Sequence, residues 1–273
     1  MPRAIWSGAL SFGLVTIPVK LYSAVSRKNV RFNQIDSETN TRVKQRRVNG
    51  AGDEVPYDRI VKGYEISKDN YVIVTDSELA SVSPQASRMI DITDFVLQSE
   101  IDPVMYESAY FLVPDELGRK AYGLLMNALE ESGRVAVATF VMRTKQYLAS
   151  IRPAHGVLMM STMLYPDEMV SPDVIPELSG LGEEHVSEAE LAMAGQLIES
   201  LASDFDPERY ADTYRGKVLE LLEAKAAGDE QHIEIAPAAE DSAVVDLLAA
   251  LEASVNAAKA RDAAGVEGDE AVA

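Results

Sequence analysis

Three consecutive apolar segments in the middle of the chain constrain the fold most strongly. The first, VAVATFVM at residues 135–142, is short and almost wholly apolar, which predicts a strand buried on both faces. The next two, at residues 147–152 and 157–164, follow after a basic turn at 143–145 and a turn at 153–156. Short turns of this kind join neighbouring antiparallel strands, so the run predicts an antiparallel sheet.

Several further segments favour extended structure, because they are rich in β-branched and aromatic residues and show no helical periodicity. These segments are residues 4–22, 31–35, 42–48, 61–66, 71–75, 89–97 and 110–113. So many short strands together predict a closed or nearly closed antiparallel barrel. With the helices described next, the expected fold class is mixed α+β, with an antiparallel β-barrel core and a helical arm at the C-terminal side.

Helices are predicted at four places before the tail. Asp76 is expected to cap a short one, and Asp115 to cap a longer one that ends at Gly133. The apolar positions of the longer helix are Leu117, Ala121, Leu124, Leu125 and Ala128. Ser187 with Glu190 forms a capping box, and Asp206 followed by Pro207 predicts the start of another helix. This last pair of helices would form an arm that packs on the barrel or on a second subunit.

Beyond this arm the sequence predicts an acidic linker at residues 226–240 and one more amphipathic helix at 241–261. The remaining residues to 273 are expected to form a disordered acidic tail. The apolar stripe of the helix consists of Val244, Leu247, Leu248, Leu251 and Val255. No packed domain remains for it to join, which favours a partner-binding helix over one that folds back onto the arm.

Charge is distributed unevenly along the chain, whose net charge is −19. Residues 1–60 hold 10 Lys and Arg against 5 Asp and Glu, whereas residues 151–273 hold 7 against 26. If residues 42–48 form a strand, Arg42, Lys44 and Arg46 face one way and Arg47 the other. A basic strip in so acidic a chain indicates a surface for a polyanion.

Ten basic residues are therefore candidates for contacts with nucleic acid. Each one taken singly is a solvated surface charge, but as a set on hairpins and turns they favour an anion-binding surface. Phosphate contacts from Lys and Arg carry affinity but no sequence information, so the expected target is duplex DNA, bound independently of sequence and weakened by salt. The candidates are Arg27, Lys28, Arg31, Arg42, Lys44, Arg46, Arg47, Arg143, Lys145 and Arg152.

Catalytic signatures are missing from the sequence. There is no cysteine for a disulfide or thiolate site, and there is no HExxH, Walker A or GxSxG motif. We expect a cytoplasmic, nucleoid-associated protein that is not an enzyme and needs no cofactor. Two alternatives stay open: a barrel-pocket enzyme using Asp167, Glu168 and His155, and a protein–protein adaptor that does not bind DNA.

Seven segments follow one another within residues 3–225: IWSGALSFGLVTIPVKLYSA, RFNQI, VPYDRIVKGYEI, AYFLVPD, ALEESGRVAVATFVMRTKQYLASIRP, LYPDEM and FDPERYADTYRGKVLELLEAK. In these segments and in their order, the chain resembles bacterial Ku proteins.

The resemblance implies a Ku core at residues 1–180, with a strand-built bridge at about 36–58, followed by a helical arm at 181–225. It implies a ring-shaped homodimer that threads onto double-stranded DNA ends in non-homologous end joining. It also implies a partner, the dedicated ATP-dependent DNA ligase, which would be recruited and stimulated. Catalytic residues and a required metal are absent from the family, and the segment at 241–273 corresponds to its ligase-binding region.

Two departures from the family bear on function. Some relatives carry a Cys-x-x-Cys pair where this chain has Asn49, Gly50, Ala51 and Gly52, so no metal is expected there. Some relatives end in a lysine-rich tail, whereas this chain ends acidic. Functions that need a basic tail, such as extra DNA bridging, are therefore not expected.

Overall fold

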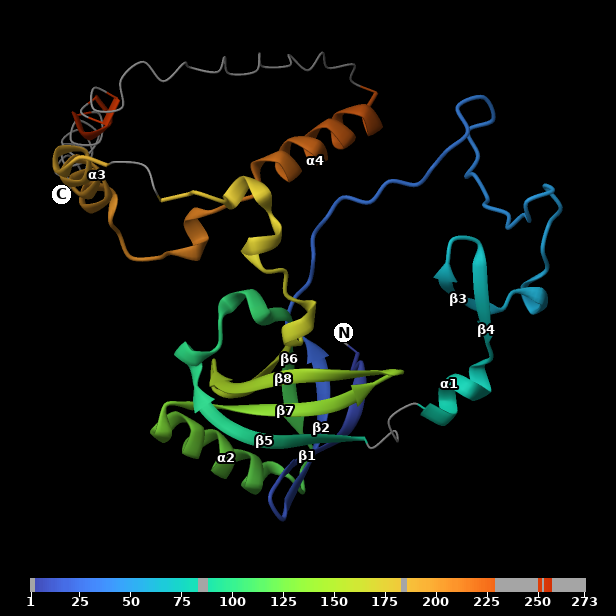
Figure 1. The fold of residues 1–273 in the computed structure, drawn as a ribbon, viewed down its shortest axis with the longest axis horizontal. Coiled ribbons are helices and arrows are strands. Elements are labelled where there is room, and N and C mark those ends of the chain that lie inside the picture. Colours follow the sequence, from blue (N-terminus) through green and yellow to red (C-terminus); the bar gives the residue numbers. More distant parts are fainter. Residues whose placement is uncertain (1–2, 83–87, 183–185, 229–249, 252, 257–273) are drawn as a thin grey trace. The chain divides into compact units, whose positions relative to one another are not determined.

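A computed structural model of the chain describes residues 3–82, 88–182, 186–228, 250–251 and 253–256. The chain divides into two compact units, Met1–Ser171 and Pro172–Ala273 (Figure 1). The first unit holds the barrel, a long arm that leaves it and carries one short helix, and a longer helix between two barrel strands. None of the helices in the described part is long and apolar enough to cross a membrane.

Seven strands form a closed barrel in the order β1-β2-β6-β9-β8-β7-β5. Six of its seven pairings are antiparallel, and the parallel pairing of β1 with β5 closes it through Ala9 and Met89. The prediction of a barrel is confirmed, including the consecutive strands β7, β8 and β9. The strands are β1 (Trp6–Phe12), β2 (Val15–Ser23), β5 (Met89–Leu97), β6 (Tyr106–Pro114), β7 (Arg134–Met142), β8 (Lys145–Ala154) and β9 (Val157–Met163).

The main core lies inside the barrel, because alternate residues of each strand point to the same side. Leu10, Ile17, Leu112 and Ile151 come from four different strands and are all fully buried. Trp6 fastens the start of β1, since its indole Nε1 donates to the Val141 carbonyl at 3.1 Å. Burial of each large apolar side chain contributes about 1.5–3 kcal/mol, so this core holds the strands in register.

Helix α2 (Arg119–Ser132) lies between β6 and β7 in sequence and packs against the barrel (Figure 1). Its buried residues are Tyr122, Leu125 and Leu129. The predicted apolar face was partly wrong, because Leu117 precedes the helix and Leu124 is 65% exposed. The stripe is rotated by about one residue, since the bulky Tyr122 takes the inward position.

The cap predicted for α2 was wrong, because the N-cap position is Gly118, which has no side chain to cap the helix. Asp115 instead accepts the Gly118 amide at 2.9 Å and holds the turn before the helix. Gly133 ends it with φ of 62°, a left-handed conformation that favours glycine, as predicted.

The long segment between β2 and β5 contains a two-stranded sheet of β3 (Lys62–Ser67) and β4 (Asn70–Val74), followed by α1 (Asp76–Val82). Both strands were predicted correctly. The predicted cap of α1 was wrong: Glu78 N donates to Thr75 Oγ1, and Glu78 Oε2 accepts the Thr75 amide. Asp76 instead pairs with Lys62 across 2.8 Å, and that interaction lowers the pKa of Asp76.

The strands predicted at 31–35 and 42–48 are not formed. In the structure these residues pair only at two isolated bridges, Ile35 with Arg42 and Val48 with Glu54. The segments are polar and lie in an exposed part of the chain, so little apolar burial stabilises a longer ladder.

The second unit contains α3 (Glu188–Leu201) and α4 (Thr213–Ala226). The capping box of Ser187 and Glu190 is confirmed, since each side chain accepts the other's backbone amide. The start of α4 differs from the prediction, because Asp206 begins only a 3-10 turn and Asp212 caps α4 by accepting the Arg215 amide.

Short 3-10 turns connect many of these elements. Most of the linker and tail predicted at 226–273 lies outside the described residues, although residues 250–251 and 253–256 are helical. The 3-10 turns are η1 (Tyr57–Arg59), η2 (Gln98–Glu100), η3 (Pro103–Met105), η4 (Pro166–Glu168), η5 (Pro172–Val174), η6 (Pro176–Leu178) and η7 (Pro207–Arg209).

Candidate nucleic-acid interface

Seven of the ten candidate cations lie on residues 24–60, which we call the basic arm. The arm leaves the barrel after β2 and is almost entirely exposed. It is built from two tight turns joined by extended chain rather than from a single basic strand. Arg42, Lys44 and Arg46 were expected to alternate on one face of a strand, but these residues do not form a regular strand.

The first turn brings Gln34 and Val43 together, with the Val43 amide donating to the Gln34 carbonyl at 3.0 Å. Asp36 organises the turn, because its carboxylate accepts the Thr39 hydroxyl at 2.6 Å and the Glu38 amide at 3.1 Å. These bonds, the Thr39 hydroxyl first, lower the pKa of Asp36. The carboxylate is therefore committed to the turn and is unsuited to hold an exchangeable proton near neutrality.

Asn49 organises the second turn. Its side-chain oxygen accepts the amides of Ala51 at 3.0 Å and Asp53 at 2.9 Å, a local arrangement typical of asparagine in turns. The Val55 amide then donates to the Arg47 carbonyl, so the chain doubles back after the turn. The hairpin turn predicted at 49–53 is confirmed, and hydrogen bonds hold it without any cysteine pair.

Two cations of the arm already contact neighbours in the arm itself. Arg46 Nη1 lies 3.2 Å from Glu54 Oε2, with both side chains largely exposed. The guanidinium of Arg47 lies 5.4 Å from the centre of the Tyr57 ring. Such exposed contacts hold a side chain only weakly, so a phosphate group can displace them.

The remaining candidate cations of the arm, Arg27, Lys28, Arg31, Arg42 and Lys44, are exposed as well. Among the described residues none of these five forms an ion pair with an acidic side chain. The arm therefore presents free positive charge, although the chain as a whole is strongly acidic.

Three candidate cations lie on the barrel instead. Arg143 occupies the turn between β7 and β8 with φ of 60°, and Arg152 is half-buried in β8. Lys145 pairs with Glu168 across 3.2 Å, and the Glu168 carboxylate raises the pKa of Lys145. Lys145 also lies 5.4 Å from the Tyr147 ring, so its charge is partly engaged within the barrel.

Glu168 is tied into the structure and is poorly suited to acid–base work. It accepts the Tyr165 amide at 2.9 Å and pairs with Lys145, and both interactions lower its pKa. A catalytic acid or base needs a pKa near the working pH, so this carboxylate is shifted in the wrong direction. Within the described part of the chain, no three His, Asp or Glu residues gather in a way that could hold a metal ion.

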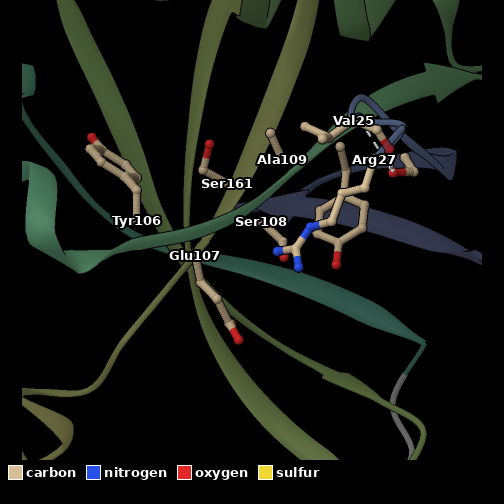
Figure 2. A pocket seen from close by; sticks show the side chains of 9 residues that line it. Val25, Arg27, Tyr106, Glu107, Ser108, Ala109 and Ser161 are labelled. Carbon is tan, nitrogen blue, oxygen red and sulfur yellow. Dashed lines mark hydrogen bonds between the residues drawn. The ribbon is translucent and has the colours of Figure 1, made fainter. Parts of the chain in front are cut away.

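Arg27 lines a cavity of about 430 Å³, which we call the Arg27 pocket (Figure 2). This pocket could not be predicted from the sequence, because strands distant in the chain form its wall. It joins the end of β2 and the start of the basic arm to β6 and β9. The lining residues are Ser23, Val25, Arg27, Tyr106, Glu107, Ser108, Ala109, Tyr110 and Ser161.

A second cavity, of about 420 Å³, is mainly apolar and lies beside α2, where Phe12, Phe95 and Leu125 contribute to its wall. Of the five residues predicted to bind a ligase, Val244, Leu247 and Leu248 lie outside the described residues. Leu251 is half-buried and Val255 is buried.

Comparison with known proteins agrees with this architecture. A family model described as the Ku70/Ku80 beta-barrel domain matches residues 11–193. The chain is 51% identical to the Non-homologous end joining protein Ku of Anaeromyxobacter sp. (strain K) over 265 residues, covering 96% of this chain and 88% of that protein.

Two further relatives carry the same name. The protein of Symbiobacterium thermophilum is 46% identical over 264 residues, which cover 96% of this chain and 65% of the relative. That of Mycobacterium tuberculosis is 40% identical over 265 residues, which cover 93% of this chain and 95% of the relative. The barrel with its long arm and the extent of these matches together establish that the chain belongs to the Ku family.

Proposed function

We propose that this chain binds the ends of double-stranded DNA, independently of sequence, in non-homologous end joining. Two copies form a ring that threads onto a free end, and the basic arm supplies contacts to phosphates. The observation that carries the proposal is the exposed basic arm of an acidic protein, on which five candidate cations have no acidic partner among the described residues. The chain belongs to a family whose compared relatives are named as non-homologous end joining proteins, and this supports the proposed role in end joining.

Contacts through exposed Lys and Arg side chains account for the lack of sequence preference. Phosphates are the same at every step of the duplex, so a guanidinium that binds them reads no base. Each phosphate neutralised releases condensed counterions, which makes the logarithm of the affinity fall with the logarithm of salt by about 0.9 per contact. The acidic remainder of the chain disfavours DNA binding to other surfaces.

The β3–β4 sheet supports the homodimer. An isolated two-stranded hairpin is marginally stable in water, yet this one exposes Tyr64 at 69% and Ile73 at 63%. These two residues lie on opposite faces, because Tyr64 pairs with Val72 and Ile73 pairs with Gly63. Burial of both faces by a second copy would stabilise the hairpin and close a ring.

The second unit supports the same assembly. Neither α3 nor α4 has a buried residue, and Leu191, Ile198 and Tyr214 are each more than 65% exposed. Helices with unburied apolar residues are typical of arms that pack in an oligomer. The helix at 241–261 and the tail to 273 are proposed to recruit and stimulate the ATP-dependent ligase at the nucleoid in the cytoplasm.

A duplex of about 30 base pairs tests the proposal when its ends are free, blocked at one end, or blocked at both ends by a bulky adduct. We expect the protein to bind the first two and to lose binding to the third. The mass of the free protein in solution should correspond to two chains. Equal binding to all three duplexes, or a monomer that binds fully, would overturn the ring.

A further inference from the structure

The Arg27 pocket lies where the basic arm leaves the barrel. The Ala24 amide donates to the Ala109 carbonyl at 3.0 Å, which holds the start of the arm on β6. The Ser23 hydroxyl donates to the Val25 carbonyl at 2.7 Å and fixes the next two residues. Arg27 is thus three residues from a point anchored on the barrel, whereas the cations of the two turns have no such anchor in the described part of the chain.

From this geometry we propose that the Arg27 pocket is a phosphate subsite that receives one nucleotide unit of the DNA strand. The inference rests on the proposed function and adds a defined site to it. Arg27 would bind the phosphate oxygens, and the pocket wall would contact the attached sugar.

The charges in the pocket favour an anion. Arg27 has no acidic partner among the described residues, and the one acidic residue in the wall is Glu107. Figure 2 shows Arg27 running toward Ser108, whereas Glu107 points away from the other labelled side chains. Glu107 Oε2 accepts the Thr162 hydroxyl at 3.4 Å, so that carboxylate already has a partner on β9.

One hydroxyl group in the wall complements the guanidinium. The side-chain oxygen of Ser108 has no hydrogen-bond partner within the described residues, so it can donate to a ligand beside Arg27. Ser161 lies on the other face of the β6–β9 pair, because it pairs with Ala109. Guanidinium and hydroxyl donors are the groups that bind phosphate oxygens in protein–DNA interfaces.

The size of the pocket favours more than a bare ion. Its volume of about 430 Å³ falls in the range of sites that hold small organic ligands. Val25, Ala109 and Tyr110 give it an apolar wall, which suits the carbon face of a deoxyribose. A phosphate with its sugar fits both the polar and the apolar parts of the lining.

Two variants test the site in the full-length protein on linear duplex. Arg27→Gln removes the charge, and Ala109→Leu fills the pocket without changing the charge. We expect Arg27→Gln to weaken binding about tenfold at 0.1 M salt and to reduce the salt slope by about one. Arg27→Lys should restore the salt slope but only part of the affinity, because the lysine ammonium lacks the planar guanidinium that can bind a phosphate through two hydrogen bonds. Thermal unfolding of each variant checks that the barrel is intact.

Arg119→Gln is the matched control, because Arg119 is an exposed cation of α2 outside the candidate set. If Arg27→Gln behaves like Arg119→Gln, the pocket is no phosphate subsite, even when wild-type protein still requires free ends. A folded Ala109→Leu variant with wild-type affinity would also overturn it. Duplexes with 5′-phosphate and 5′-hydroxyl ends identify the source: a loss confined to the first indicates the terminal phosphate, and equal losses indicate the backbone.

Discussion

Arg46 and Glu54 face each other across the second turn of the basic arm, with Nη1 and Oε2 3.2 Å apart. The contact is exposed and lies among side chains that we propose bind phosphates. Glu54 therefore competes with DNA for the guanidinium of Arg46. Arg46 can therefore exchange the Glu54 carboxylate for a DNA phosphate without a change in the backbone of the arm.

Replacing Glu54 by Gln should strengthen DNA binding about two- to fivefold, the range expected for an exposed ion pair. The change removes the competing carboxylate and leaves the turn, which Asn49 holds. Titration of a labelled linear duplex at constant salt measures the effect. Glu38→Gln is the control for net charge, because Glu38 lies on the same arm and forms no ion pair in the described structure. Equal gains in both variants would show that Arg46 and Glu54 are not in competition with DNA.

The pair of Lys145 and Glu168 should give a pH-dependent contribution to stability. The folded state lowers the pKa of Glu168, so its contribution is present above the ordinary glutamate pKa of about 4.3 and is lost as the pH falls through the lower, folded value. The folded state raises the pKa of Lys145, so that contribution is present below about 10.4 and is lost as the pH rises further. Between these two pH limits, the contribution of the pair to the stability of the fold does not change with pH.

Glu168→Gln should therefore lower the melting temperature at pH 7, and the difference from wild type should shrink toward pH 3. Melting curves across this range provide the test, with Asp167→Asn as the neighbouring control. A difference that stays constant down to pH 3 would show that the Glu168 carboxylate does not contribute through its charge.

Tyr122 joins α2 to two barrel strands. Its hydroxyl donates to the Leu112 carbonyl at 2.8 Å and accepts the Leu158 amide at 2.6 Å, and burial raises the pKa of Tyr122. Tyr122→Phe leaves both backbone groups without this partner and should reduce the free energy of unfolding by about 1–3 kcal/mol. Urea unfolding with an unchanged m-value measures the loss.

Tyr106→Phe supplies the matched control, because the Tyr106 hydroxyl is buried and has no hydrogen-bond partner among the described residues. Its removal should leave stability unchanged or slightly increased. A loss as large as that of Tyr122→Phe would contradict the assignment of these hydrogen bonds.

Deletion of residues 241–273 should separate the two proposed roles. End binding should persist, because the proposed phosphate contacts lie in the first unit, whereas stimulation of the ligase should disappear. Duplex titration and a nick- or end-sealing assay with the ligase measure the two effects. Loss of end binding in the truncated, folded protein would show that the division of roles is wrong.

The barrel was predictable from the sequence because its strands are short, strongly apolar and separated by turn signals. Strand β2 buries alternate residues, whereas β8 and β9 also bury neighbouring residues, such as Ser150 with Ile151 and Leu158 with Met159. The predicted bounds of the strands at 135–142 and 157–164 agree with the structure to within a residue or two. The end of α2 at Gly133 was predictable because glycine readily adopts the left-handed conformation found there.

The basic arm was not predictable at the level of its backbone. Alternating charge at Arg42, Lys44 and Arg46 is compatible with a strand, but no buried face selects one, and local hydrogen bonds of Asp36 and Asn49 decide the structure. The prediction of Asp76 as the cap of α1 was wrong for a similar reason. Thr75 and Asp76 are both residue types that cap helices, and the side chain of Asp76 pairs with Lys62 instead. The Arg27 pocket could not be predicted, because its wall comes from the end of β2, from β6 and from β9, which only the strand pairing of the barrel brings together.

The most direct test of the central claim uses one closed circular plasmid and the same plasmid cut once. A ring that threads onto ends requires at least one free terminus, whereas surface contacts to phosphates do not. With relaxed circles and linear molecules at equal mass and salt, we predict retention of the protein on linear DNA and negligible retention on circles. Equal retention on both forms would contradict threading.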